Sequence, residues 1–265
     1  LVMRRAMEYA LAFDVPVVDH CEDLHLSEGG CMNEGFVSTQ LGLQGVPAAA
    51  EDVMVARNLA LAELTGARLH LAHLSTAGSV RMVREAKARG IKVTAEAAPH
   101  HFMLTEEAVC GYNTHAKMNP PLRTGMDVQA IKDGLRDGTI DVIATDHAPH
   151  ATQEKQQEFA AAPNGIVGLE TAWPLTLTLV EEGVLSLEAA IAKLTTEPAR
   201  AFSLKKGTLT PGADADVVIA DLHEGWEVDP ARFRSKGRNT PFAGWKVKGR
   251  ITTTIVGGRI VHETT

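Results

Sequence analysis

Apolar and polar residues follow two different periods along the chain up to residue 201. Apolar positions at helical spacing predict helices at residues 1–13, 48–64, 75–88, 131–136 and 187–194. Between them, short runs rich in Val and Ile predict strands at residues 15–18, 68–71, 91–97 and 140–145. Strands that alternate with helices are typical of parallel βαβ units, whose strands all end on one side of the sheet. The pattern therefore predicts an α/β fold.

The pattern changes near Phe202. Residues 207–229 and 245–263 contain short runs rich in Val, Ile and Thr, separated by Pro-Gly and Gly-Gly turns, and show little helical spacing. The sequence therefore predicts two regions, an α/β domain at residues 1–201 and a small β unit at residues 202–265.

A histidine or an aspartate follows three of the predicted strands. These residues are His20 in VPVVDHCED, His73 in LHLAHLST and Asp146 in IDVIATDHAPH. Because parallel strands end at the same edge, the three side chains should face one mouth of the sheet, where imidazole and carboxylate groups can bind zinc. This arrangement indicates a metal hydrolase. Taken alone, a histidine at a strand end is more often a core residue, and Asp146 could instead cap a helix or turn before His147.

Composition narrows the class of protein. A length of 265 residues suits one barrel-sized α/β domain or two smaller domains. The net charge of -7, without any run of Lys or Arg, argues against nucleic acid as a partner. The three cysteines form no CxxC pair and leave an odd one over, which favours a reducing cytoplasm. No stretch approaches the roughly 20 apolar residues of a membrane span, so we expect a soluble cytoplasmic protein.

Several motifs occur in one order along the chain, namely HCED, LGLQGVPAAAED, LAHLSTAGSV, VTAEAAPHH, KMNPPLR, ATDHAPH, GIVGLET, LTPGADADVVIAD and VGGRIV. Together they resemble dihydroorotases of the bacterial class I type, within the amidohydrolase superfamily, over essentially the whole chain. Such proteins have a (β/α)8 TIM-type barrel with a companion β-sandwich. The resemblance implies that residues 1–201 supply barrel strands five to eight and that residues 202–265 supply part of the sandwich.

The resemblance also implies features that this sequence lacks. The family begins with an HxH motif on its first strand and has a metal-bridging aspartate after its fourth, but none of the eleven histidines here forms an HxH pair. Four strands alone cannot close a barrel without exposed edges. We therefore expect the chain to be the C-terminal portion of a longer enzyme, with the N-terminal half of the barrel as its partner.

In the resembled family, the residues that match His20, His73 and Asp146 are zinc ligands, and two zinc ions are expected per complete site. Asp146 would also be the catalytic residue, because its carboxylate can take a proton from the metal-bound hydroxide and pass it to the leaving amide nitrogen. With the other ligands outside it, the chain alone is expected to bind zinc weakly and to be inactive.

The resemblance assigns substrate contacts to Asn119, to His150 and to the backbone of Asn164 and Gly165. The Asn119 amide can both donate and accept, as a cyclic imide or ureide requires, although Asn also suits the turn before Pro120. His150 would contact the substrate carboxylate or carbonyl, or would otherwise pack at the rim. A contact made by the backbone tolerates a change of side chain at Asn164. Gly165 alone would be hard to replace, if the main chain must approach the substrate closely there.

Three further polar residues carry weaker signals. His100 and His101 are adjacent, so in extended chain they would point to opposite faces, and we interpret them as structural. Arg123 in KMNPPLR could orient its loop, bind an acidic group of the substrate or lie solvated at the rim.

The activity implied by the resemblance is the reversible interconversion of dihydroorotate and N-carbamoyl-L-aspartate in pyrimidine biosynthesis. An allantoinase or hydantoinase is the enzymatic alternative, because the superfamily shares its metal ligands, and KMNPPLR favours a dihydroorotase. The non-enzymatic alternative is a degenerate homologue that serves as a partner of aspartate transcarbamoylase. Loss of ligands would be the sign of such a homologue. The chain keeps all five residues that match metal ligands or substrate contacts of the family, which argues that the parent protein is catalytic: His20, His73, Asn119, Asp146 and His150. Family members often form dimers, so a homodimer is a further candidate.

Overall fold

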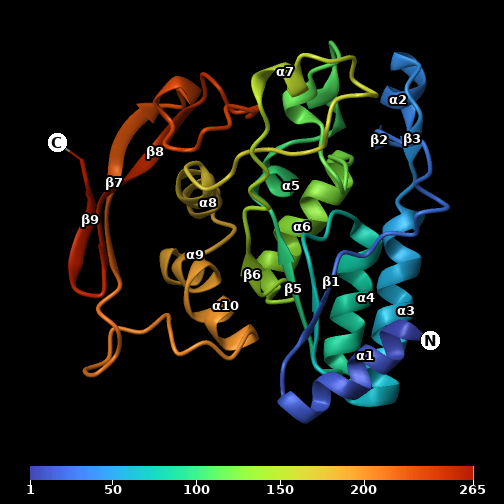
Figure 1. Ribbon diagram of the computed structural model, residues 1–265, viewed down its shortest axis with the longest axis horizontal. Coiled ribbons are helices and arrows are strands. Elements are labelled where there is room, and N and C mark those ends of the chain that lie inside the picture. The colour runs from blue at the N-terminus through green and yellow to red at the C-terminus, as the bar shows by residue number, and fades with distance from the viewer. Residues whose placement is uncertain (265) are drawn as a thin grey trace.

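The computed structural model describes residues 1–264, and four parallel strands form its central sheet (Figure 1). The strand order is β1 (Val17–Asp19), β4 (Leu69–Leu71), β5 (Val93–Ala97) and β6 (Val142–Ile143). All three pairings are parallel, with Leu69 between Val17 on one side and Val93 on the other. The predicted α/β fold with a parallel sheet is confirmed.

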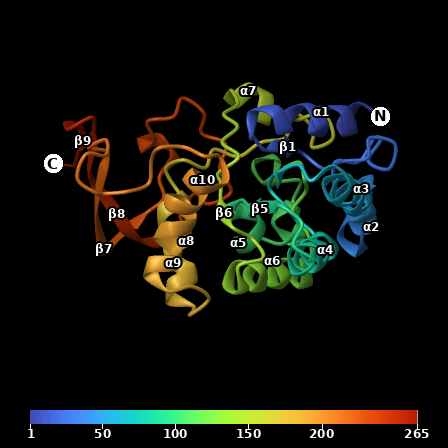
Figure 2. The ribbon, with the colours of Figure 1, turned by 90° about the horizontal axis from the view of Figure 1, so that it is seen from below.

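Helices α3 (Ala49–Thr65), α4 (Ala77–Ala88) and α6 (Gly125–Asp137) pack side by side along this sheet (Figures 1 and 2). Helix α1 (Val2–Ala10) packs against α3 and lies across its lower end in Figure 1. The apolar residues of these helices meet the strands in a core that includes Leu71, Val83 and Ile131, all with no exposed surface. Burial of such side chains stabilises the fold by about 1.5–3 kcal/mol each. None of the helices described in residues 1–264 is long and apolar enough to cross a membrane.

Capping residues set the length of α6. Thr124 and Asp127 form a reciprocal capping box before its first turn, and Gly138 in the left-handed conformation ends it. The helix is longer than the one predicted at residues 131–136, because the buried residues that carry the apolar signal begin only at Ile131.

The C-terminal region contains α8 (Ala172–Glu181), α9 (Leu187–Leu194), α10 (Thr196–Ala201) and the antiparallel strands β7 (Val217–Glu227), β8 (Lys246–Val256) and β9 (Arg259–Glu263). The strand order is β7-β8-β9. Gly257 and Gly258 both have positive φ and connect β8 to β9, as a tight hairpin turn requires. The described residues of the C-terminal region form one sheet, so a sandwich with a second sheet stays a prediction.

Short elements gather at the end of the sheet to which β1 runs (Figure 1). They are β2 (Met32–Asn33), α2 (Phe36–Leu41), β3 (Gly45–Val46), α5 (Pro99–Met103) and α7 (Thr152–Lys155). Single 3-10 turns occur at Leu11–Phe13, Glu106–Val109, Thr114–Ala116 and Pro230–Arg232. The loops that follow the strands therefore cover the edge at which the sequence predicts a site.

Two local predictions differ from the structure. In the segment predicted as a strand at residues 140–145, only Val142–Ile143 pairs with β5. His100 and His101 lie in α5 rather than in extended chain, because Pro99 favours the first turn of a helix. Both histidines are buried, which agrees with their interpretation as structural residues.

Candidate active site

The three predicted metal ligands follow three of the four strands of the sheet, the adjacent strands β1 and β4 and the edge strand β6. His20 comes directly after β1, His73 two residues after β4, and Asp146 three residues after β6. His73 and Asp146 have φ values of 31° and 46°, which residues other than glycine rarely adopt. Such strained backbone is concentrated at functional sites. Both residues therefore have an unusual backbone conformation just beyond the end of a strand.

His20 and His73 face each other. His20 Nδ1 lies 3.1 Å from His73 Nε2, with the rings edge to face and their centroids 4.7 Å apart. Two nitrogens that bind one tetrahedral zinc at about 2.0–2.1 Å would lie roughly 3.3 Å apart. The other ring nitrogen of His73, Nδ1, is buried without a hydrogen-bond partner in residues 1–264. The pair therefore fits two donors of one metal ion.

Asp146 is not grouped with these histidines into a closed metal site. Within residues 1–264, no three His, Cys, Asp or Glu side chains converge closely enough to hold a metal ion. Asp146 is half-buried, and the next helix, α7, begins only at Thr152. The alternative role of a helix cap is thereby excluded. The structure brings two of the predicted ligands together and leaves the third at the end of β6, which β5 separates from β4.

Glu22 is a site residue that sequence reasoning missed. Its Oε2 accepts hydrogen bonds from His20 Nε2 at 3.0 Å and from Asn119 Nδ2 at 2.9 Å. Burial raises the pKa of Glu22, but hydrogen bonds from Ser27, Asn119 and His20 outweigh it and lower that pKa below its usual value. The signal was present in HCED, because residues two apart in extended chain share a face.

Asn119 lies at a bend before Pro120, yet its side chain faces the histidines. In addition to its bond with Glu22, Asn119 Nδ2 lies 3.5 Å from His20 Nε2. His101 supports this segment, because its Nε2 donates to the Pro120 carbonyl at 3.0 Å. Burial lowers the pKa of His101 to about 3, so the ring is neutral and suited to that bond. Asn119 thus both forms the bend before Pro120 and contributes its side chain to the candidate site.

His150, Asn164 and Gly165 form a second group. His150 Nε2 donates to the Asn164 carbonyl at 2.8 Å, and the Gly165 N–H donates to the Lys117 carbonyl at 2.9 Å. Gly165 has a φ of 144°, and a Cβ there would lie 2.8 Å from both His150 Nε2 and Ala148 Cβ. The predicted need for glycine therefore has a structural reason in these contacts. The Gly165 N–H is already bonded within the chain.

Arg123 is neither at the rim nor open to a substrate. It is 3% exposed, and its guanidinium donates to Ser75 Oγ, Asn33 Oδ1 and the Val46 carbonyl at 3.1, 2.9 and 2.7 Å. These bonds tie the KMNPPLR segment, which carries Arg123, to the loop after His73 and to the segment around β2 and β3. Of its three candidate roles, the structure supports the orientation of the loop.

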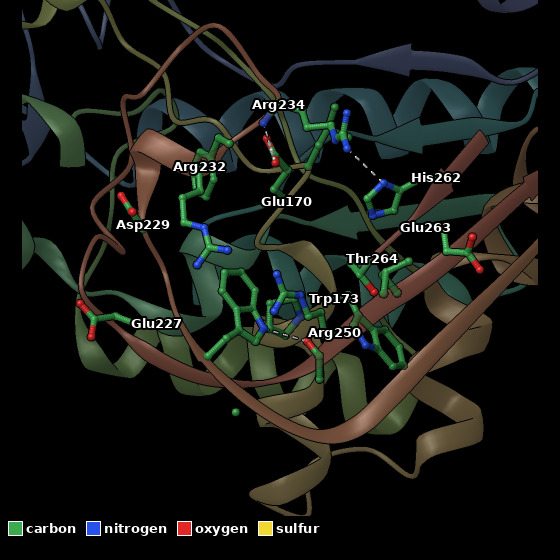
Figure 3. Close-up of a pocket in the computed structure, with 17 residues that line it drawn as sticks. Glu170, Trp173, Glu227, Asp229, Arg232, Arg234, Arg250, His262, Glu263 and Thr264 are labelled. Atoms are coloured by element: carbon green, nitrogen blue, oxygen red, sulfur yellow. Dashed lines mark hydrogen bonds between the residues drawn. The ribbon is translucent and has the colours of Figure 1, made fainter. Parts of the chain in front are cut away.

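A separate hollow of about 940 Å³ lies between α8 and the β7-β8-β9 sheet (Figure 3). Its lining carries charges of both signs, among them Glu170, Arg232 and Arg250, and Arg234 Nη2 lies 3.5 Å from His262 Nδ1. None of the predicted ligands or substrate residues lines it. The histidine pair at the mouth of the parallel sheet is therefore the better candidate for a catalytic site.

The fold and the strand-end histidines define a class of protein that a family model also identifies. A model of the amidohydrolase family matches residues 2–261. The chain belongs to the amidohydrolase family.

Within that family, similar relatives are named dihydroorotase. The chain is 56% identical to the dihydroorotase of Syntrophus aciditrophicus (strain SB) and 61% identical to that of Pelotomaculum thermopropionicum, over 263 residues in each case. Each match covers 99% of this chain and 62% of the relative. The chain thus spans less than two thirds of the length of the relatives that it matches.

Solved structures share the fold at lower identity. The L-hydantoinase (dihydropyrimidinase) from Arthrobacter aurescens has a TM-score of 0.87 and 28% identity, covering 98% of this chain and 60% of that one. The dihydropyrimidinase from Brevibacillus agri NCHU1002 has the same TM-score at 24% identity, covering 98% and 59%. The second likeness bears on the fold alone.

Proposed function

We propose that the complete gene product is a dihydroorotase, which interconverts dihydroorotate and N-carbamoyl-L-aspartate in pyrimidine biosynthesis. The names of relatives at 56% and 61% identity support this function. The observation that carries it within the chain is the contact of His20 with His73 on one side and with Glu22 on the other, where Glu22 also accepts a hydrogen bond from Asn119. Two proposed metal donors, His20 and His73, thus lie next to the Asn119 amide, which can hydrogen-bond to the imide of a ring.

His20 Nδ1 and His73 Nε2 would hold a zinc ion, with Asp146 and donors outside the described residues completing a two-metal site. Bound zinc polarises a carbonyl group and makes water acidic enough to attack near neutral pH. The donor chemistry supports zinc, because neutral imidazole and carboxylate are among its preferred ligands.

Asp146 is the proposed general base and acid. Its carboxylate accepts a proton from the attacking water and returns it to the amide nitrogen that leaves when the ring opens. In the reverse direction the same group takes the proton from that nitrogen before the ring closes. The half-buried position of Asp146 at a strand end supports a role in which it reaches both atoms.

Glu22 fixes the tautomer of His20. Because an ionised carboxylate only accepts, the proton of the neutral imidazole stays on Nε2, and the lone pair of Nδ1 points towards His73. Asn119 would then orient the ring of the substrate, and His150 with the backbone at Asn164 and Gly165 would hold its other side.

A hydantoinase is the alternative within this fold, because the structural relative at 28% identity is one. Turnover of dihydroorotate, hydantoin and allantoin by the complete gene product, with metal analysis of the same preparation, tests the choice. Preferential turnover of dihydroorotate is the expected result. Turnover of hydantoin or allantoin alone would contradict the proposal, and a well-folded product that turns over none of them would favour the non-catalytic role.

The remaining parts of the proposal concern the setting of the enzyme. We propose a cytoplasmic location, because the odd cysteine count of the chain does not suit a disulfide framework. Association with aspartate transcarbamoylase, or as a homodimer, is a proposal from the resemblance. Size measurement of the purified product, with and without aspartate transcarbamoylase, tests both.

A further inference from the structure

Lys117 and Lys155 bury their ammonium groups beside the loop that leads to Asn164. The two residues are 5% and 3% exposed. Lys117 Nζ donates to the carbonyls of Ala160 and Ala162 at 2.9 and 2.6 Å, and Lys155 Nζ donates to that of Pro163 at 2.7 Å. Within residues 1–264, the lysines that form ion pairs with carboxylates are Lys87, Lys132, Lys206 and Lys248, so neither of these two ammonium groups has such a partner. Backbone carbonyls of one loop therefore solvate both charges.

This arrangement is costly for a fold that needs only stability. A buried charge without a counter-ion pays for desolvation, and an apolar side chain of similar size avoids that term. Burial lowers the pKa of Lys117, and burial together with the charge of Lys117 lowers the pKa of Lys155 to about 8. The lysines are therefore better explained by what their carbonyl partners do.

The carbonyl partners directly precede the proposed substrate contacts. Pro163 is followed by Asn164, whose carbonyl accepts the bond from His150, and by Gly165, whose N–H donates to the Lys117 carbonyl. Lys117 thus holds this loop with its side chain and with its backbone. Thr114 Oγ1 also donates to the Lys155 carbonyl, which fixes the backbone of the second lysine.

We propose that Lys117 and Lys155 are positioning residues that hold the backbone of Asn164 and Gly165 against His150. The inference rests on the proposed function, in which that backbone and His150 hold the substrate. Lys117 also lies two residues before Asn119 in KMNPPLR, so one short segment carries a contact to the ring and an anchor for the opposite loop. A shift of the anchor would then alter both sides of the substrate site.

Lys193 provides a matched control. It is 7% exposed, and its Nζ donates to a backbone carbonyl, that of Ile140, at 2.5 Å. Ile140 precedes β6, so this contact lies at the opposite end of the strand from Asp146. Lys193→Met removes a buried ammonium group of the same kind without touching the loop.

The test uses the complete gene product and the variants Lys117→Met, Lys155→Met and Lys193→Met. We expect kcat/KM for dihydroorotate to fall about 10- to 100-fold in the first two variants, mainly through a higher KM, because a displaced binding group weakens productive placement. Zinc content should stay at the wild-type level. Hydrogen exchange of the Gly165 amide should become faster in the same two variants, and Lys193→Met should change neither property.

Lys117→Gln and Lys155→Gln keep an N–H donor and should recover part of the loss. Folded Met variants with wild-type KM and wild-type exchange at Gly165 would overturn the proposal and leave the proposed function intact. If the Met and Gln variants fail to fold while Lys193→Met folds, the two lysines are stability elements and the proposal is wrong. A wild-type product without dihydroorotase activity would contradict the proposed function instead. Hydrogen exchange of the Gly165 amide would then decide by itself whether the two lysines position the loop.

Discussion

The carboxylate of Glu22 lies 3.0 Å from Nε2 of His20, on the side of the ring opposite to the nitrogen that faces His73. The same carboxylate oxygen accepts a hydrogen bond from the side-chain amide of Asn119. A single side chain therefore orients a proposed metal ligand and a proposed substrate contact. Loss of a group that holds a metal-binding histidine in this way typically lowers metal affinity or activity about 10- to 100-fold.

Replacement of Glu22 should consequently weaken the metal site. We expect Glu22→Ala to lower zinc affinity about 10- to 100-fold, because the His20 ring loses its acceptor, and Glu22→Gln to lower it less, because the amide oxygen still accepts. Competition with a chelator measures the affinity. Glu28→Gln is the control, since Glu28 is an exposed carboxylate of the same loop. Equal zinc affinity in Glu22→Ala and wild type would refute this role.

Metal ligands and substrate contacts should separate by their effects. His20→Ala and His73→Ala should empty a metal position, whereas Asn119→Ala and His150→Ala should keep the zinc content and lower kcat/KM. Metal analysis and steady-state kinetics on the same four preparations make the comparison. The division fails if His150→Ala loses as much zinc as His73→Ala does.

The proposed proton-transfer role of Asp146 predicts a specific kinetic loss. Asp146→Asn can still offer a neutral oxygen to a metal but cannot accept a proton, so kcat should fall on the order of 10²-fold or more. Zinc content should fall much less than kcat. A near-normal kcat in this variant would remove Asp146 from the mechanism.

Gly165→Ala tests the close approach of the backbone to His150. The added Cβ would meet His150 Nε2 and Ala148 Cβ at 2.8 Å, so the ring must move and kcat/KM should fall about 10-fold or more. Gly42→Ala is a matched control, because Gly42 also has a positive φ, of 65°, but has no atom within 4 Å of an added Cβ. It should lose about 1 kcal/mol of stability and keep its activity. Similar kcat/KM values in the two variants would show that the close approach of Gly165 to His150 does not matter for activity.

Lys155 should make stability depend on pH in the alkaline range. Its pKa is lowered from 10.5 to about 8 in the folded chain, so between these values the unfolded chain binds more protons. The free energy of unfolding of the wild type, relative to Lys155→Met, should therefore rise as the pH increases from 8 to 10.5, and the penalty is complete below pH 8. Denaturant titrations of both proteins across this range measure the difference. A constant difference would mean that Lys155 keeps an ordinary pKa.

The sequence alone determined the parallel α/β fold and the edge of the sheet that carries the candidate site. Apolar periodicity reports burial, and the direction of parallel strands then sends His20, His73 and Asp146 to one end. These conclusions depend on neighbours in sequence and on a general rule of chain topology. They did not require any contact between distant residues.

Only the tertiary structure decided how the side chains at that edge meet. Glu22 and Asn119 are 97 residues apart, and Lys117 reaches a carbonyl 45 residues away, so no local pattern links them. The contact of His20 with His73, the separation of Asp146 from that pair and the burial of Arg123 are likewise results of packing between segments. Residue types and strand ends name the chemistry that is available, but the hydrogen bonds that orient it form only when the folded chain brings distant loops together.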